Sequence, residues 1–289
     1  MGVTLLTFIL IIFLIVIVTR NLMIHNIRKL AVLLKWKSNI LGQILGYITS
    51  MPELISAIVA GSIGMVSTSI YNVMFSNFSN LFLVIFFTLI FKRTKSIINS
   101  KFIYDYIIVM ITIVVPPVLI MADLATTPYA IPALIAIYGI YLYGSKYVDY
   151  FAIEEEEIEI EEKLHKKEFE SEKASKREIN DKNRVALAVT MIFISIILLY
   201  ILGENLGKVL ETLGKEMGVS EMILGLIMGI TTSIPELVAY ISSYRRHKNY
   251  RKPETDKGAV EVVNNLATSN ISNLTIIQTI AILSYMFLS

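Results

Sequence analysis

The strings GYITSMPELI (46–55) and GITTSIPELV (229–238) decide the fold of this chain, because each places a proline and a glutamate inside an apolar stretch long enough to cross a bilayer. Sliding the sequence by 183 residues superimposes the Gly, Thr, Ser, Pro, Glu and Leu positions of the two strings. After an insertion of ten residues in the 245–257 connection, SNFSNL (76–81) also meets SNISNL (269–274). Matches at this spacing indicate an internal repeat.

The composition is typical of a multi-span membrane protein, since 55% of the 289 residues are hydrophobic and only 17% are charged. A transmembrane helix needs roughly 20 mainly apolar residues. This length predicts an all-α polytopic membrane protein with about eight spans, at 2–19, 38–62, 66–91, 103–122, 127–145, 184–203, 220–244 and 258–288. The first run has no preceding basic region and no small-residue cleavage site, so we expect a retained helix rather than a signal peptide.

The residue types restrict the chemistry of any site. The chain has no cysteine, which excludes disulfides and thiolate metal ligands. Its three histidines (His25, His165 and His247) fall in predicted polar connections, where we expect solvated side chains rather than metal ligands. The net charge of +2 gives no indication of a nucleic-acid partner, and we predict no bound cofactor and no enzymatic activity.

The distribution of basic residues predicts the orientation in the membrane. Lys and Arg gather after the first, third and seventh predicted spans, whereas the connections 63–65 and 123–126 contain none. The positive-inside rule then places the basic connections in the cytoplasm and both termini outside. We expect this membrane to be the plasma membrane. The predicted organisation is a first transmembrane repeat (1–146), a charged cytoplasmic linker (147–183) and a second, shortened repeat (184–289).

The linker begins with an acidic run, EEEEIEIEE (154–162), and continues with mixed charge. A solvated, partly helical linker is the favoured interpretation. An acidic calcium sensor is the alternative.

The two repeats are predicted to be inverted, because the second and seventh spans cross the membrane in opposite directions. Inverted repeats are typical of secondary transporters whose substrate site lies at the repeat interface near the bilayer midplane. An ionisable group at that depth is costly unless it is paired or faces a polar cavity. Glu53 and Glu236 are therefore predicted to approach one another, and a cation between them would neutralise the pair.

The residues around the glutamates offer oxygen atoms. Pro52 and Pro235 remove a backbone donor and predict a helix break in each span, which leaves carbonyl groups free. Hydroxyl and amide side chains near these breaks, and on the SN strings, complete the all-oxygen environment that hard cations prefer. A single S-x-P-E string is also typical of a capped helix start, and the SN strings alone are also typical of hydrogen bonds between helices. The glycines at 42, 46, 225 and 229 fit close helix packing.

Together these strings resemble the two alpha-repeats of the calcium/cation antiporter superfamily, which includes the sodium/calcium exchangers. The family pattern is a T-S-x-P-E break followed in the next helix by a G-S-N-I-x-N/D string, once in each half. Here it reads TSMPE with FSNFSN, and TSIPE with TSNISN. The resemblance implies an inverted-repeat exchanger fold in which the first helix of each half slides across an ion-binding core. It implies these metal ligands: Thr49, Ser50, Glu53, Ser76, Asn80, Thr232, Ser233, Glu236, Ser269 and Asn273.

Three departures from the family pattern are visible. The glycine before S-N is Phe75 in one repeat and Thr268 in the other, so local packing should differ. Asn273 stands where many sodium/calcium members have an aspartate, which leaves two formal negative charges. The family also has five spans in each half, whereas the second half here has three. We therefore expect the apolar face of 274–288 to meet lipid or the second subunit of a homodimer.

These observations predict a membrane antiporter that exchanges Ca²⁺ for Na⁺ or H⁺ by alternating access, with the ion held between Glu53 and Glu236 and with lipid and inorganic cations as its partners. Two alternatives stay open. One is a divalent-cation channel or passive conduit, and the other is a membrane scaffold that transports nothing.

Overall fold

The computed structural model describes every residue except 1, 63, 152–178, 219, 248–255 and 289. Most of the predicted linker (147–183) and part of the 245–257 connection, with His165, therefore lie outside the described residues. The described part is helical throughout and contains no strand. Its longer helices are α1 (Gly2–Ile17), α2 (His25–Leu33), α3 (Ser38–Thr49), α4 (Met51–Ser62), α5 (Val66–Ile90), α7 (Ile103–Met121), α8 (Ala130–Phe151), α10 (Ile179–Met217), α11 (Glu221–Thr232), α12 (Ile234–Arg246), α13 (Lys257–Ser272) and α14 (Gln278–Leu288).

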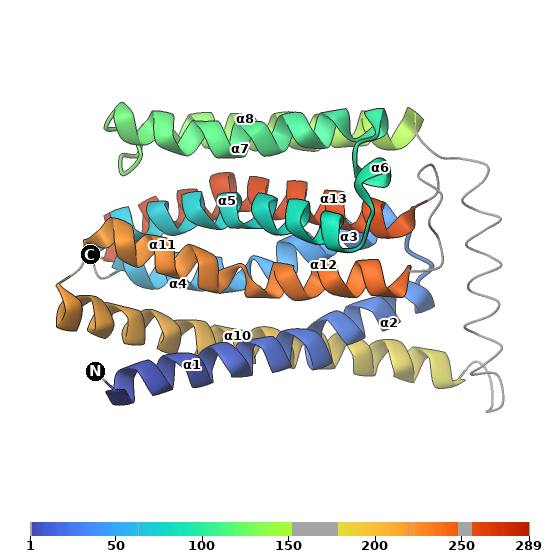
Figure 1. Cartoon of the computed structure of the whole chain (residues 1–289), viewed down its shortest axis with the longest axis horizontal. Coiled ribbons are helices and arrows are strands. Elements are labelled where there is room, and N and C mark those ends of the chain that lie inside the picture. Colours follow the sequence, from blue (N-terminus) through green and yellow to red (C-terminus); the bar gives the residue numbers. More distant parts are fainter. Residues whose placement is uncertain (1, 63, 152–178, 219, 248–255, 289) are drawn as a thin grey trace.

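Seven helical segments of the described chain are long and apolar enough to cross a membrane. The prediction of a polytopic α-helical membrane protein is therefore confirmed. These segments are Leu6–Leu33, Ser38–Ser62, Val66–Ile90, Ser100–Met121, Asn183–Val209, Glu221–Arg246 and Lys257–Phe287. Helix α8 covers the predicted fifth span and lies along α7, but it is not among the seven (Figure 1).

Two predicted spans are longer than expected. The first does not end at residue 19, because α1 continues through a π-helical segment (Val18–Ile24) into α2 and ends at Leu33. Arg20 and Arg28 therefore lie on a helix rather than in a connection. Helix α10 has 39 residues where a span at 184–203 was predicted. An apolar run in the sequence predicts only the part of a helix that faces lipid. The polar ends of a longer helix lie outside that run.

The helices form layers (Figure 1). Helices α1 and α10 pack side by side along one side of the bundle, and α7 and α8 lie along the other. Between them lie the two interrupted spans, α3–α4 and α11–α12, with the helices α5 and α13. The densest packing joins α13 to α3 and α11 to α5, so each half contributes one helix to each of two matching pairs.

The flank of α13 is covered within the chain, which corrects one expectation. Helices α7 and α8 pack on α13 and on the segment that follows it. As a result Leu274 and Ile282 are buried, while Ile277 is buried against α4 and α5, all with exposed fractions of at most 2%. Only residues near the end of α14, such as Met286 and Phe287, are exposed as predicted for the whole face of 274–288. A homodimer stays a prediction, and the surface left for it is smaller than expected.

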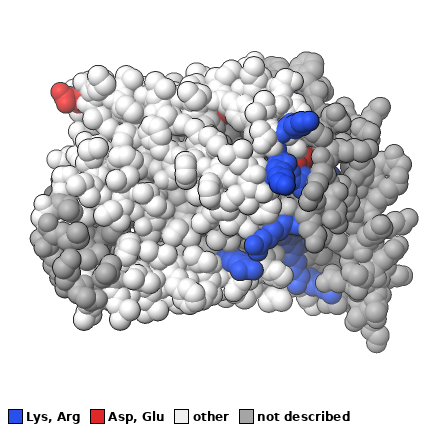
Figure 2. All heavy atoms as spheres, viewed as in Figure 1, with Lys and Arg blue, Asp and Glu red and all other residues white. Residues whose placement is uncertain are grey.

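The two ends of the bundle differ in charge. On the face shown in Figure 2, Lys and Arg side chains gather at the end where α2 and α6 (Thr94–Ile97) lie, which we call the basic end. Described members include Lys35, Lys92 and Lys95, all exposed. The start of α1 and the end of α14 both lie at the opposite end (Figure 1). The predicted sidedness, in which the basic end faces the cytoplasm, stays a prediction.

Candidate functional site

Both motif-bearing spans are interrupted at the serine before the proline. Helix α3 ends at Thr49 and α4 begins at Met51, while α11 ends at Thr232 and α12 begins at Ile234. The serine between each pair leaves helical geometry, with φ −81° and ψ 5° at Ser50 and φ −76° and ψ 1° at Ser233. The interruptions occur at equivalent positions because the two halves carry the same string.

The proline explains the backbone change. A proline has no N–H, so Pro52 cannot donate to the carbonyl four residues earlier, at Ile48. The amide of Ser50 donates to that carbonyl instead. Ser233 makes no side-chain cap on α12, and its hydroxyl donates back to the carbonyl of Gly229 at 2.7 Å. The interpretation of the second string as a capped helix start is therefore wrong.

Glycines allow the interrupted spans to lie against the other half. A Cβ atom added at Gly46 would stand 2.8 Å from the backbone oxygen of Asn265 on α13. A Cβ atom added at Gly229 would stand 2.7 Å from the backbone nitrogen of Ser76 on α5. Gly42 and Gly225 are equally close to the same partner helices. The prediction that these glycines serve packing is confirmed.

The two glutamates are completely buried and each accepts a hydrogen bond from a serine. Glu53 Oε1 accepts from Ser76 at 2.8 Å, and Glu236 Oε1 accepts from Ser269 at 2.8 Å. Ser50 also donates to Glu236 Oε1, at 3.4 Å. Ser50 belongs to the first half and Glu236 to the second, so this bond joins the two halves at the buried carboxylates.

The serines of the breaks connect the halves. The hydroxyl groups of Ser50 and Ser269 lie 2.8 Å apart, and those of Ser233 and Ser76 lie 3.0 Å apart. Each break is thus hydrogen-bonded to the SN string of a helix that packs against it. The pattern is reciprocal, as expected for inverted repeats.

The threonines are more strongly engaged by the backbone than predicted. Thr49 donates to the carbonyl of Leu45 at 2.8 Å, and Thr232 donates to that of Met228 at 3.0 Å. Both still lie beside a carboxylate of the opposite half, Thr49 near Glu236 and Thr232 near Glu53. All ten predicted site residues are therefore in, or directly beside, one buried cluster.

Asparagines complete the cluster. Asn80 donates to Ser269 at 3.2 Å, and Asn273 donates to Ser76 at 3.3 Å. Sequence reasoning missed Asn77 and Asn270, each of which donates to the other's backbone carbonyl, at 3.3 and 3.2 Å. Their side-chain oxygens also accept from the amides of Asn273 and Asn80, both at 3.1 Å. Asn77 and Asn270 are the second residues of the two repeated SN strings, and this repetition is the signal that could have identified them.

Four acceptor oxygens in the cluster have no hydrogen-bond donor: Glu53 Oε2, Glu236 Oε2, Asn80 Oδ1 and Asn273 Oδ1. Buried acceptors without partners are rare because each loses its hydration. The set consists only of oxygens and carries two formal negative charges, which is the donor chemistry of a hard cation. In the described part of the chain no group of three or more His, Asp or Glu residues could hold a metal, so the charge of this cluster rests on the glutamate pair.

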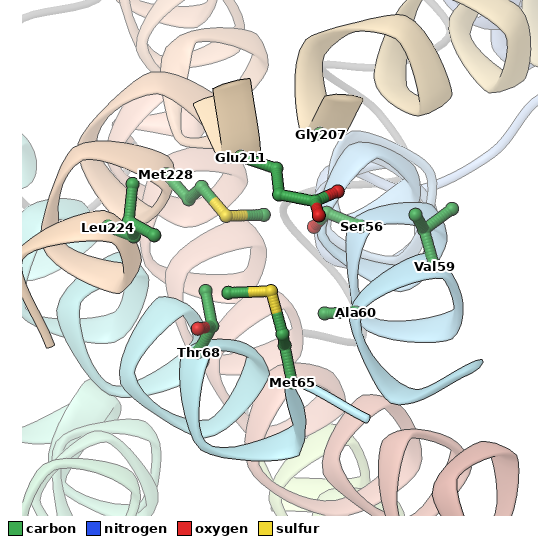
Figure 3. Close-up of a pocket in the computed structure, with 9 residues that line it drawn as sticks. All are labelled: Ser56, Val59, Ala60, Met65, Thr68, Gly207, Glu211, Leu224 and Met228. Atoms are coloured by element: carbon green, nitrogen blue, oxygen red, sulfur yellow. The ribbon is translucent and has the colours of Figure 1, made fainter. Parts of the chain in front are cut away.

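A pocket lies between the cluster and the end of the bundle that holds the termini. It is formed by α4, α5, α10 and α11, and its volume of about 20 Å³ is room for a single water molecule (Figure 3). The lining residues are Ser56, Val59, Ala60, Met65, Thr68, Gly207, Glu211, Leu224 and Met228. The carboxylate of Glu211 points into the pocket towards Ser56 (Figure 3).

The pocket connects to the cluster by hydrogen bonds. Asn72 donates to Ser56 at 2.9 Å and accepts from Thr232 at 3.2 Å. A polar path therefore leads from the pocket to the side of Glu53.

Comparison with known proteins agrees with this geometry. A family model described as "Sodium/calcium exchanger protein" matches residues 3–147 and 187–288, which is most of the chain and includes every residue of the cluster. No curated protein and no solved structure matched. On the strength of the family match, with the interrupted helices and the paired glutamates it contains, the chain belongs to the sodium/calcium exchanger protein family.

Proposed function

We propose that the protein exchanges Ca²⁺ for Na⁺ or H⁺ across the membrane, and that Glu53 and Glu236 hold the ion between them. The family supports cation exchange in general. The observation that carries the finer assignment is the set of four buried acceptor oxygens without donors, two of them carboxylate oxygens. A cation is a suitable partner for such acceptor oxygens.

Charge balance is compatible with Ca²⁺ as the exchanged ion. Two carboxylates in a buried site carry a charge of −2, which one divalent ion or two monovalent ions neutralise. Asn273 is neutral, so this pair of glutamates is not joined by a third carboxylate from α13. Amide and hydroxyl oxygens complete a flexible oxygen shell of the kind that Ca²⁺ accepts.

The packing supports alternating access rather than a passive conduit. The conduit interpretation depended on an incomplete second half, and α7 and α8 cover α13 within the chain. The pocket lies towards one end of the bundle, while buried ion pairs lie at the basic end. This difference between the two ends supports access from one side at a time, which an exchanger needs because a path open at both ends would let ions run down their gradients.

Flux measurements in proteoliposomes test the proposal. We expect Ca²⁺ uptake when a Na⁺ or a H⁺ gradient is imposed separately, and the gradient that works identifies the counter-ion. Glu53→Gln and Glu236→Gln should each abolish uptake and Ca²⁺ binding while the protein still folds, because each removes half of the site's charge. Glu204→Gln is the control, since Glu204 lies on the surface of α10 in an i,i+4 pair with Lys208. Ca²⁺ flux that needs no gradient, or that survives loss of either buried glutamate, contradicts the proposal.

A further inference from the structure

A row of polar side chains runs along one face of α13 from the basic end to the cluster. Glu261, Asn265, Ser269 and Asn273 are spaced four residues apart, so they lie on the same side of the helix. The row has a counterpart on α5, where the same alignment that pairs the SN strings gives Thr68, Asn72, Ser76 and Asn80. Each row starts at one end of the bundle and ends at the glutamate pair.

The row on α5 begins at an open pocket. Thr68 lines the pocket described above, and its amide and hydroxyl both contact Glu221 at the start of α11, at 3.1 and 3.2 Å. Asn72, one turn further in, is fully bonded to Ser56 and Thr232. In the first half, the polar row therefore begins at the pocket, and its next residue has hydrogen-bond partners for both side-chain polar atoms.

The row on α13 begins at a closed ion cluster. Glu261 takes the place of Thr68, and its exposed fraction is 2%. One of its oxygens accepts from Arg28 at 2.9 Å and the other lies 2.8 Å from His247 Nε2. Arg28 also donates to Ser243 at 2.8 Å, and Ser243 is the counterpart of the pocket residue Ala60. In the second half, the guanidinium group of Arg28 therefore lies at the place that corresponds to the pocket of the first half. The prediction that His247 is solvated is wrong, because it is buried here with an exposed fraction of 6%.

The next residue in this row has no hydrogen-bond partner. Both side-chain polar atoms of Asn265 are buried without a donor or an acceptor. The comparison with Asn72 accounts for the amide nitrogen, because the counterpart of its acceptor Ser56 is Ala239, which has no hydroxyl. A buried amide of this kind is costly unless another state of the protein supplies its partner.

Arg28 belongs to a different layer from Glu261. It lies on α2, which continues α1 and packs against α10, while Glu261 lies on α13 beside α3. A displacement of α1 and α2 along the bundle would withdraw the guanidinium group from Glu261 and leave a carboxylate one turn from an unpaired amide. His247 would remain beside one oxygen of Glu261, and the oxygen that Arg28 leaves would be open to a cation.

We propose that Glu261 and Asn265 form an inner subsite for the transported cation, and that Arg28 fills this subsite as a tethered positive charge when the inner path is closed. The subsite rests on the proposed function for the identity of its ligand, Ca²⁺. This proposal explains how the basic end closes. Glu261 binds either the cation that arrives from the cytoplasmic side or the guanidinium group of Arg28.

A thiol-accessibility experiment tests the closing role of Arg28 without measuring transport. The native chain has no cysteine, so Ser243→Cys places a single thiol beside the guanidinium group. We expect a membrane-impermeant thiol reagent applied from the cytoplasmic side to modify this cysteine slowly. Adding Arg28→Gln should raise the rate about tenfold or more, because removing one partner of a buried pair favours the open arrangement.

Arg93→Gln is the matched control. Arg93 forms another buried ion pair at the same end, 2.6 Å from Asp256, and also donates to the carbonyl of His247. It lies just before α6 rather than on α2, so its loss should leave the modification rate unchanged. An equal increase in the two variants would mean general loosening of the basic end and would overturn the closing role.

A sided transport experiment tests the subsite itself. Glu261→Gln should raise the half-saturating Ca²⁺ concentration about tenfold for uptake from the cytoplasmic side and leave the outer side unchanged, since it removes a charged ligand from one path only. Asp256→Asn is its control at the start of the same helix. Equal changes on both sides, or none, would refute the subsite. If the wild-type protein moves no Ca²⁺ at all, the proposed function fails, and the thiol experiment still decides the role of Arg28.

Discussion

Replacing Gly46 by alanine tests whether the buried cluster around Glu53 and Glu236 depends on the close approach of α3 and α13. The added Cβ would stand 2.8 Å from the backbone oxygen of Asn265 and 2.9 Å from the backbone nitrogen of Ser269. Both neighbours are backbone atoms and cannot rotate away. Reaching an ordinary contact of 3.4 Å requires the two helices to separate by about 0.6 Å.

The expected cost follows from two opposing terms. Overpacking of this kind costs about 1–3 kcal/mol. Alanine also has a better helix propensity than glycine, which raises the free energy of unfolding by up to about 1 kcal/mol. We therefore expect the free energy of unfolding to fall by about 1–2 kcal/mol. The separation would also stretch the 2.8 Å hydrogen bond between Ser50 and Ser269, so transport should fall with stability.

Gly139→Ala supplies the control with the opposite sign. Gly139 lies within α8, and a Cβ added there meets nothing within 4 Å. Only the propensity term then applies, and this variant should be more stable than the wild type by up to about 1 kcal/mol. Thermal unfolding of both variants in the same detergent gives the comparison. The reasoning is refuted if Gly46→Ala melts at or above the temperature of Gly139→Ala.

Three further outcomes are expected. Asn273→Asp adds a third carboxylate beside Ser76, and we expect tighter cation binding or a changed Na⁺ dependence of transport; unchanged transport at every Na⁺ concentration would place Asn273 outside the site. Asn77→Ala removes the acceptor of the Asn273 amide and one half of the reciprocal pair with Asn270, and should lower the free energy of unfolding by about 1–3 kcal/mol in denaturation curves. Single cysteines at 286 and 287 should cross-link in bilayers if the exposed end of α14 forms a homodimer, whereas one at the buried position 277 should not; a monomeric pattern at all three positions argues against the dimer.

The repeat is the reason why the candidate site could be predicted from the sequence. A proline and a glutamate are costly in an apolar span. Their presence at equivalent places in both halves therefore identifies them as candidate functional residues from the sequence alone. The position of each break and the role of the glycines follow from the same strings. Asn77 and Asn270 belong to the same repeated string and carry the same amide side chain as the predicted residues Asn80 and Asn273, so the repeat alone indicates them as well.

The ion pair between Arg28 and Glu261 at the basic end could not be predicted from the repeat. Arg28 and Glu261 lie 233 residues apart, and neither belongs to a repeated motif. A positive residue after an apolar run is ordinarily a mark of the cytoplasmic boundary, and this led to the expectation of a connection at 20–37. The structure instead continues the helix to Leu33, because the guanidinium group finds a buried carboxylate and a serine hydroxyl there. The covering of α13 by α7 and α8 was missed for a similar reason, since packing between distant helices leaves no local pattern.

The inverted repeat separates residues that must be alike from residues that must differ. An ion at the interface of two inverted halves has the same ligands whichever end is open, so the glutamates, serines and asparagines of the cluster repeat. Closing one end at a time requires the two access rows to be unequal in a given state. One pair that breaks the symmetry lies on those rows, where Thr68 aligns with Glu261, and another lies beside them, where Ser56 aligns with Ala239. The residues of the outer row carry no formal charge and bond to neighbouring helices, whereas the inner row carries the carboxylate of Glu261, which pairs with Arg28 of α2. On the proposed function, the substitutions between the repeats are expected where closure is controlled, and the identities are expected where the ion is held.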